Sequence, residues 1–352
     1  MKETNRIHSL DYLRGLMATS IMLYHFGYWS GVKYDANMLF GRLGIYGVSI
    51  FYVLSGITLY NVYKDRLTFE KHTLIDFFVK RIFRIFPLLW IANTLSILLN
   101  WYKTHHFPNL SLIFLNYTGL FGFISPDKYL STGAWSIGNE LVFYAIFPIL
   151  ILSIKYNQIL WFILAGIGLL VGIYFGYEIL NEDLPLAEQW GNYVNPFNQF
   201  WLFLGGVLMA WSSLFFKSKL NNSAIAIGLL LLISLFVFFP VDGSQLFLVI
   251  KLNRIIFVAL SIGISIGFFW LDWAFLPSFL DTILSFLGKI SYSIYLLHPI
   301  FFLGLKSVNQ KYFHLSNIPI YFIGIAISLF SANFVYNFIE KPMINWGKRV
   351  VE

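Results

Sequence analysis

Apolar stretches of about twenty residues recur along the whole chain, and short polar segments separate them. Because a helix rises about 1.5 Å per residue, each stretch can cross the roughly 30 Å hydrocarbon core of a bilayer. No small-residue cleavage site follows the basic N-terminus, so we expect the first stretch to be a retained span. The pattern predicts ten membrane-spanning helices, at about 9–28, 43–63, 82–102, 135–154, 158–176, 196–216, 222–240, 252–272, 285–305 and 318–338.

The fold class that this pattern predicts is all-α, in a polytopic membrane protein. No internal repeat or low-complexity linker divides the chain, so we expect one integral membrane domain over residues 1–352, with no fused soluble domain.

Two connecting segments carry patterns of their own. Residues 64–80 mix charged residues with Phe77, Phe78 and Val79, which favours an amphipathic helix along the inner membrane surface before the third span. Residues 103–133 contain the apolar piece LSLIFLNYTGLFGF, which is too short to cross comfortably. We expect it to form a re-entrant or interfacial element on the outer side.

The distribution of positive charge sets the orientation. Ten spans place both termini on one side, and that side receives fifteen basic residues: Lys2, Arg6, Lys64, Arg66, Lys71, Lys80, Arg81, Arg84, Lys155, Lys217, Lys219, Lys289, Lys341, Lys348 and Arg349. The other side receives eight: Lys33, Arg42, Lys103, Lys128, Lys251, Arg254, Lys306 and Lys311. Since cytoplasmic loops carry the excess of Lys and Arg, we expect both termini to be cytoplasmic.

The composition supports a membrane protein and excludes several other classes. Hydrophobic residues make up 58% of the chain and charged residues 12%, and the mean hydropathy is +0.70. There is no cysteine, which excludes disulfides and thiolate chemistry. The net charge of +7 is not gathered into a basic stripe with stacking aromatics, so we expect no nucleic-acid partner. The pair His105 and His106 lacks further ligands, so we expect no metal site.

The first span carries three ionisable residues, each of which makes insertion into a membrane more costly. Asp11 and Arg14 are three residues apart, and His25 follows Arg14 by eleven, so at about 100° per residue all three lie on one helical face. Arg14 lies near the inner leaflet, and His25 lies about 16 Å further out. A purely structural role is an ion pair between Asp11 and Arg14, with the histidine bonded to a neighbouring helix.

Glu140 and His298 fall in the outer half of the membrane, as His25 does. Two histidines and a carboxylate at similar depth suit a proton-transfer site, because a catalytic histidine needs a partner that sets its tautomer. A proton pathway through a transporter would use the same three residues, and depth alone does not separate the two functions.

Arg81 and Arg84 open the third span in the segment VKRIFRIFP and project from nearly one face. Paired guanidiniums bind phosphate oxygens in a bidentate manner. Anchoring to lipid phosphate is the alternative. Because Arg14 lies at the same depth, the pattern favours a phosphorylated cofactor.

Six motifs, in order from Leu10 to Pro342, together resemble the acyltransferase family 3 membrane proteins. They are LDYLRGLMATSIMLYHF with Arg14 and His25, GVSIFYVLSG, KRIFRIFPLLW, WSIGNELVFYAIFP with Trp135, Ser136, Glu140 and Pro148, LGKISYSIYLLHPIF with Ser291, Tyr292, Tyr295 and His298, and FIEKP. Ser49 and Asn139 stand where many members carry an acidic residue, so Glu140 is the one carboxylate of its motif.

The resemblance implies transfer of an acyl group, most often acetyl, from acyl-coenzyme A to a sugar hydroxyl of a cell-surface polysaccharide or lipid-linked glycan. Acyl-coenzyme A, with acetyl-coenzyme A the commonest, is the implied donor, and the implied location is the inner (cytoplasmic) membrane of a bacterial cell, among membrane lipid. The oligomeric state stays open.

The residue roles follow from both lines of reasoning. We expect Arg81, Arg84 and Arg14 to hold the phosphates, His25 to act as general base, and Glu140 or His298 to orient it. Tyr292 and Tyr295 are candidate donors to an oxyanion, Ser136 a supporting residue, and Asp11 a residue that orients Arg14. Direct transfer and an acyl-enzyme both stay open. The competing functions are a proton-coupled secondary transporter and a non-catalytic scaffold.

Overall fold

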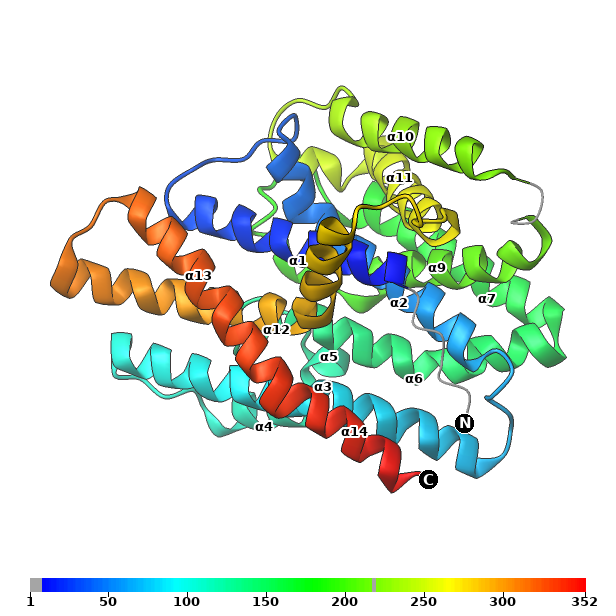
Figure 1. Ribbon diagram of the computed structural model, residues 1–352, viewed down its shortest axis with the longest axis horizontal. Coiled ribbons are helices and arrows are strands. Elements are labelled where there is room, and N and C mark those ends of the chain that lie inside the picture. Colours follow the sequence, from blue (N-terminus) through cyan, green and yellow to red (C-terminus); the bar gives the residue numbers. More distant parts are fainter. Residues whose placement is uncertain (1–7, 217–219) are drawn as a thin grey trace.

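The computed structural model describes residues 8–216 and 220–352, and the regular structure of these residues is entirely helical (Figure 1). Each of the ten predicted ranges overlaps a helix: α1 His8–Trp29, α2 Leu39–Tyr63, α3 Lys71–Thr104, α6 Trp135–Tyr156, α7 Gln158–Tyr174, α9 Pro196–Phe216, α10 Asn222–Phe238, α11 Lys251–Trp270, α12 Ser278–Val308 and α13 Asn317–Val335.

Shorter elements connect or extend these helices. They are α4 Leu110–Thr118, α5 Phe121–Ile124, α8 Trp190–Tyr193 and α14 Lys341–Val350, the π-helical turns η1 Phe175–Ile179, η4 Asn309–Phe313 and η5 Tyr336–Glu340, and the 3-10 turn η3 Gln245–Leu248. Among the described residues, seven helical stretches are long and apolar enough to cross a membrane. The expected all-helical polytopic membrane protein is therefore what the chain forms.

Neighbouring helices alternate in direction along the chain. α1 and α2 are antiparallel, with Arg14 beside Thr58 and Ile21 beside Gly47. α1 and α12 run parallel, because Gly15 contacts Gly288 near their starts and His25 contacts His298 further along. In Figure 1 the start of α1, the end of α2, the start of α3 and α14 gather at the right-hand end. The turn between α12 and α13 lies at the left-hand end.

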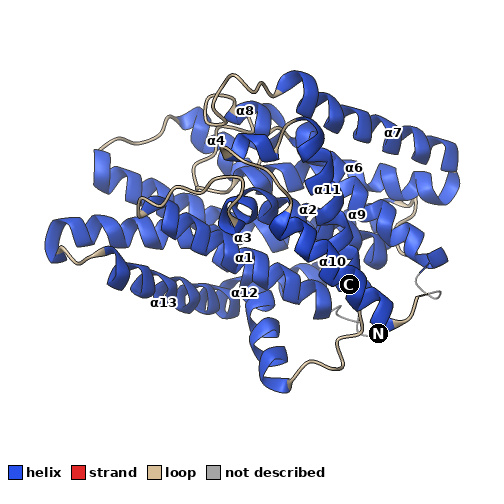
Figure 2. Cartoon of the chain, turned by 90° about the horizontal axis from the view of Figure 1, so that it is seen from above, coloured by secondary structure: helices blue, strands red, loops and turns tan. Residues whose placement is uncertain are grey.

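Two glycines bring α1 and α12 into backbone contact. A Cβ on Gly288 would lie 2.4 Å from the carbonyl oxygen of Asp11, and one on Gly15 would lie 2.6 Å from the amide nitrogen of Gly288. Small residues at such a crossing let the two backbones approach closely. Both views also show α12 changing direction sharply in its first half (Figures 1 and 2). This contact sets the lateral position of every functional side chain on α1 relative to those on α12.

The separate surface helix expected within residues 64–80 is wrong. α3 begins at Lys71 and continues without a break to Thr104, through Pro87. The reason is that Phe77 is fully buried against Tyr63 and Phe147, so the start of α3 is anchored to α2 and α6. A 34-residue helix is about 51 Å long, which exceeds the roughly 30 Å hydrocarbon core.

The segment 103–133 forms two helices too short to cross, α4 and α5, as its length predicted. Asn116 fixes this segment, because its amide nitrogen donates to Lys128 O and its oxygen accepts from the Leu130 amide. A Cβ on Gly122 would lie 2.4 Å from Gly138 O, so α5 packs directly on α6. The segment is therefore seated against the helices that carry Glu140 and the arginines.

Two arginines counted among the outer charges are in fact structural. Arg42 is 2% exposed and donates to the carbonyl oxygens of Ala36, Phe236 and Phe239. Arg254 is also buried and donates to Asn198 O and Val249 O. Each satisfies buried backbone carbonyls, so neither belongs in a loop count. Four other counted residues, Lys2, Arg6, Lys217 and Lys219, lie outside the described residues.

Candidate active site

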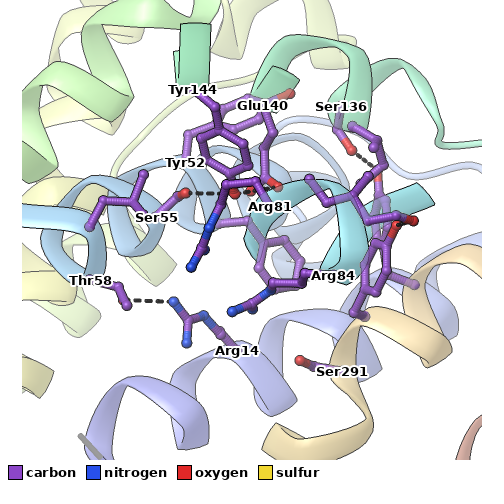
Figure 3. A pocket seen from close by; sticks show the side chains of 16 residues that line it. Arg14, Tyr52, Ser55, Thr58, Arg81, Arg84, Ser136, Glu140, Tyr144 and Ser291 are labelled. Atoms are coloured by element: carbon purple, nitrogen blue, oxygen red, sulfur yellow. Dashed lines mark hydrogen bonds between the residues drawn. The ribbon is translucent and has the colours of Figure 1, made fainter. Parts of the chain in front are cut away.

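A cavity opens where α1, α2, α3, α6 and α12 meet (Figure 3). Its empty volume is about 730 Å³, including the solvent at its mouth. Seven of the ten predicted site residues line this cavity, and an eighth, Asp11, contacts the lining residue Arg14. The lining residues from the prediction are Arg14, Arg81, Arg84, Ser136, Glu140, Tyr292 and Tyr295.

Arg14 is held in place from two sides. One terminal nitrogen lies 3.2 Å from Asp11 Oδ1, and the other donates to Thr58 Oγ1 at 2.7 Å. Asp11 and Arg14 are three residues apart on α1, which is the spacing that places side chains on one face. The guanidinium therefore enters the cavity in a fixed orientation, as Figure 3 shows.

Arg81 and Arg84 lie one helical turn apart on α3, and both project into the same space. The Arg81 guanidinium lies over the rings of Tyr63 and Tyr144, at 5.8 and 5.9 Å from their centroids. Its buried Nε has no hydrogen-bond partner, and Arg84 makes no hydrogen bond to any described residue. Unused guanidinium donors facing a cavity indicate an anionic ligand, because buried donors are rarely left unpaired.

Glu140 lies with the arginines and is a hydrogen-bond partner of neither His25 nor His298. Its Oε2 accepts from the Tyr144 hydroxyl at 3.0 Å, and the charges of Arg84, Arg14 and Arg81 all act on it. Height along a helix does not fix lateral position, and α6 presents this side chain to α3. The carboxylate offsets part of the positive charge of the cavity.

His25 and His298 form a pair beyond the cavity. His25 Nδ1 lies 2.9 Å from His298 Nε2, and His298 Nδ1 lies 2.8 Å from Ile294 O. A carbonyl can only accept, so His298 Nδ1 carries the proton, and the Nε2 of a neutral His298 accepts from His25 Nδ1. His25 Nε2 is then left with its lone pair. This is the form that a general base requires.

Neighbouring aromatic side chains hold the rings of His25 and His298 in place. His298 is 1% exposed, whereas His25 is partly exposed and stacks on Trp29, with centroids 4.9 Å apart. Tyr295 connects the pair to the cavity, because it lines the cavity and its ring centroid lies 6.4 Å from that of His298. The accessible member of the pair is thus His25.

A family model described as an acyltransferase domain, that of acyltransferase family 3, matches residues 7–336. The chain belongs to acyltransferase family 3. The resemblance seen in the six motifs is confirmed by this match. No solved structure matches the chain.

Three named proteins from two bacteria and a virus are similar to this acyltransferase family 3 chain. A protein of Staphylococcus aureus (strain COL), provisionally named an O-acetyltransferase, is 26% identical over 98% of this chain and 58% of its own length. The peptidoglycan O-acetyltransferase OatA of Listeria monocytogenes is 25% identical over 97% of this chain and 57% of its length. A protein of Acidianus two-tailed virus, provisionally named an acetyltransferase, is 27% identical over 81% of this chain and 80% of its length. The chain thus spans somewhat more than half the length of the first two.

Three hydroxyl side chains of the family motifs support the site. Tyr295 donates to Gly133 O at 3.0 Å, Ser136 donates to the Tyr295 oxygen at 2.9 Å, and Tyr292 donates to Ile85 O at 2.9 Å. Both tyrosine protons are therefore used by backbone carbonyls. The suggestion that Tyr292 and Tyr295 donate to an oxyanion does not fit this geometry, whereas their role as supports does.

Other residues of the site carried weaker signals in the sequence. Tyr144 follows Glu140 by four residues in the same motif, a spacing that brings side chains together on a helix. Glu340, in the closing motif FIEKP, is buried and accepts from Ser293 Oγ at 2.9 Å. Ser55 and Thr58 also line the cavity, and nothing in the sequence distinguishes them from other hydroxyl residues of a helix.

The described residues contain no group of three or more His, Cys, Asp or Glu that could hold a metal ion. The donors that face the cavity are guanidinium and hydroxyl groups, which suit phosphate and carbonyl oxygens.

Proposed function

We propose that this acyltransferase family 3 chain is a membrane-bound O-acyltransferase. It moves an acyl group, most often acetyl, from cytoplasmic acyl-coenzyme A to a sugar hydroxyl of a cell-surface polysaccharide or lipid-linked glycan. The observation that carries the proposal is one cavity that gathers Arg14, Arg81 and Arg84, with a base-competent His25 beyond it. The names of the relatives, which include a peptidoglycan O-acetyltransferase, support the reaction class.

The topology that we propose has ten spans, with both termini in the cytoplasm and the chain in the inner membrane of a bacterial cell. The alternating helix directions support it, because α1 and α12, the proposed first and ninth spans, run parallel. The corrected charge count supports the orientation. In this topology the three arginines lie in the half of the bundle nearer the cytoplasm, and His25 lies nearer the outer face.

Donor binding follows from the charges of the cavity. Arg81 and Arg84 offer unpaired guanidinium donors to phosphate oxygens of acyl-coenzyme A, and Arg14 adds a third positive charge. The uncharged pantetheine arm then extends past Tyr295 toward the histidines. This direction matches the separation of about 16 Å along α1 between Arg14 and His25.

The chemical step uses the lone pair of His25 Nε2. It takes the proton of the acceptor hydroxyl as the oxygen attacks the thioester carbonyl, and the new C–O bond forms as the C–S bond breaks. The sulfur leaves with the electron pair and receives the proton from His25, which gives an ester and free coenzyme A thiol. His298 holds the tautomer of His25 throughout. We propose direct attack, because no described hydroxyl side chain is hydrogen-bonded to His25.

The rival transporter function would need His25, His298 and Glu140 to form one proton relay. Glu140 instead bonds to Tyr144 among the arginines, and neither histidine is its hydrogen-bond partner. The separation of the carboxylate from the pair supports the enzyme.

A transfer assay tests the proposal. Purified protein is incubated with acetyl-coenzyme A labelled in its acetyl group and with a panel of glycans, and the label is located by mass spectrometry. We expect an acetyl ester on a sugar hydroxyl and release of coenzyme A thiol. Protein that binds no coenzyme A, and releases none with any acceptor, would overturn the proposal.

A further inference from the structure

A row of three tyrosine rings lies immediately beside His25, outside the arginine cavity. Tyr24 is at the centre of this row. The centroid of its ring lies 5.2 Å from the Tyr34 centroid and 6.2 Å from the Tyr28 centroid. The ring planes of Tyr24 and Tyr28 are inclined by 18°. The Tyr24 centroid also lies 5.3 Å from that of His25. Tyr28, at one end of the row, is 55% exposed.

The row is held in place by specific contacts. The Tyr24 hydroxyl donates to Gln245 Oε1 at 2.9 Å, and Gln245 Nε2 donates to Gly41 O at 2.7 Å. This chain of bonds ties α1 to η3 and to the start of α2. The Tyr24 ring therefore has a fixed orientation, unlike a tyrosine that merely anchors a helix at the membrane surface.

Two glycines make room for the rings. A Cβ on Gly44 would lie 2.7 Å from the Tyr24 ring, and a Cβ on Gly27 would lie 1.9 Å from the Tyr34 hydroxyl oxygen. Gly44 therefore lets Tyr24 lie against α2, and Gly27 lets Tyr34 cross over α1. Any larger residue at either position would displace a ring.

Hydrogen-bonding groups adjoin the aromatic row. Ala36 N donates to Gly243 O at 2.8 Å, which brings the loop after α1 against the loop before η3. The exposed side chains of Asp35, Asn37 and Asp242 lie on these two loops, and Asn37 Nδ2 is 3.5 Å from Asp242 Oδ1. Asp35 directly follows Tyr34, so these carboxylate and amide groups adjoin the Tyr34 end of the row, and together with the exposed ring of Tyr28 they match a sugar ring. The C–H face of a sugar is apolar and its edge carries hydroxyls.

We propose that Tyr24, Tyr28 and Tyr34 form the acceptor subsite, in which a pyranose ring lies on the exposed face of Tyr28 with a hydroxyl directed to His25 Nε2. This inference rests on the proposed acyl transfer and adds to it the place where the acceptor sugar binds. Donor and acceptor then approach His25 from opposite ends of α1, the donor from Arg14 and the acceptor from Tyr28.

The test compares acceptor kinetics in detergent-purified full-length protein. The probes are acetyl-coenzyme A, the oligosaccharide that the wild type acetylates fastest from a panel of glucose, N-acetylglucosamine, galactose and rhamnose oligomers, and glycerol as a non-sugar alcohol. Tyr28→Ala should raise the KM for the oligosaccharide about tenfold, the change that about 1.4 kcal/mol of lost contact gives, with kcat unchanged. Tyr28→Trp should restore the KM, because it returns an aromatic face.

The matched control is Tyr177→Ala. Tyr177 is 43% exposed, in η1, and should leave the KM unchanged. Coenzyme A affinity and transfer to glycerol should be the same in all variants, since neither uses the aromatic row.

Two outcomes would overturn the inference while leaving the proposed function standing. One is an unchanged oligosaccharide KM in Tyr28→Ala, and the other is a wild type that acetylates glycerol as efficiently as every oligosaccharide. A wild type that transfers acetyl to nothing would overturn the proposed function itself, and the acceptor subsite with it.

Discussion

At the scale of the residue, the direction of the hydrogen bonds through two histidines determines which nitrogen of His25 keeps its lone pair. The carbonyl of Ile294 forces the proton of His298 onto Nδ1, and this in turn forces the proton of His25 onto its own Nδ1. The reactive nitrogen of His25 is thus determined by a backbone carbonyl on another helix. In the proposed mechanism His298 acts through His25 and is a positioning residue.

Loss of His298 should therefore reduce the rate without reducing donor binding. We expect His298→Ala to lower kcat on the order of 10² or more, the contribution of a positioned general base, with the KM for acetyl-coenzyme A unchanged. His298→Asn, which keeps an acceptor group at this position, should recover part of the rate. Steady-state kinetics measures both, and an unaltered kcat in His298→Ala would contradict the role.

At the scale of the element, the decisive contact is the crossing of α1 and α12. It places Arg14 in the cavity and His25 against His298 at the same time. Gly288 is the limiting residue of this crossing, because a Cβ there would meet the carbonyl of Asp11 at 2.4 Å. Neither backbone can move without moving the site.

Gly288→Ala should therefore be destabilising and inactivating. Overpacking costs about 1–3 kcal/mol, and the displaced α1 would separate His25 from His298. Gly166→Ala on α7 is the matched control, because an added Cβ there meets nothing within 4 Å, and it should be neutral or slightly stabilising. Thermal unfolding in detergent and transfer activity are measured for both variants, and they distinguish Gly288→Ala from the Gly166→Ala control. Equal melting temperatures would contradict the role of the crossing.

Much at this scale could be predicted from the sequence. The ten apolar ranges, and the shared face of Asp11, Arg14 and His25, follow from helical periodicity. The lateral position of Glu140 could not be predicted, because it depends on how α6 is rotated against α3. The burial of Arg42 and Arg254 could not be predicted for a similar reason. The carbonyl groups of Phe236 and Asn198, to which they donate, are distant in the sequence.

At the scale of the whole molecule, the proposed donor and acceptor sites lie toward opposite ends of the bundle. The arginines lie toward the end that gathers the start of α1, the start of α3 and α14 (Figure 1). His25 and the tyrosine row lie toward the opposite end. In the proposed topology, such an arrangement would let a cytoplasmic thioester acylate a glycan on the outer face without releasing an intermediate.

The absence of cysteine from the sequence makes this topology directly testable. We expect a cysteine at Lys155, in the last turn of α6, to be protected from a membrane-impermeant maleimide in intact cells. A cysteine at His314, between α12 and α13, should be labelled. Permeabilised cells should label both, and labelling of Lys155→Cys in intact cells would contradict the orientation.

The central claim is that the arginines bind the donor and His25 performs the chemistry, so the most direct measurement combines coenzyme A affinity with acetyl transfer in the same variants. We predict that His25→Ala binds coenzyme A as the wild type does and transfers no acetyl. Arg81→Ala with Arg84→Ala should weaken coenzyme A binding at least about tenfold, because two phosphate-binding groups are lost. Arg349→Ala, at an exposed position of α14, should change neither quantity. Transfer by His25→Ala, or unchanged coenzyme A affinity in the double arginine variant, would contradict the account.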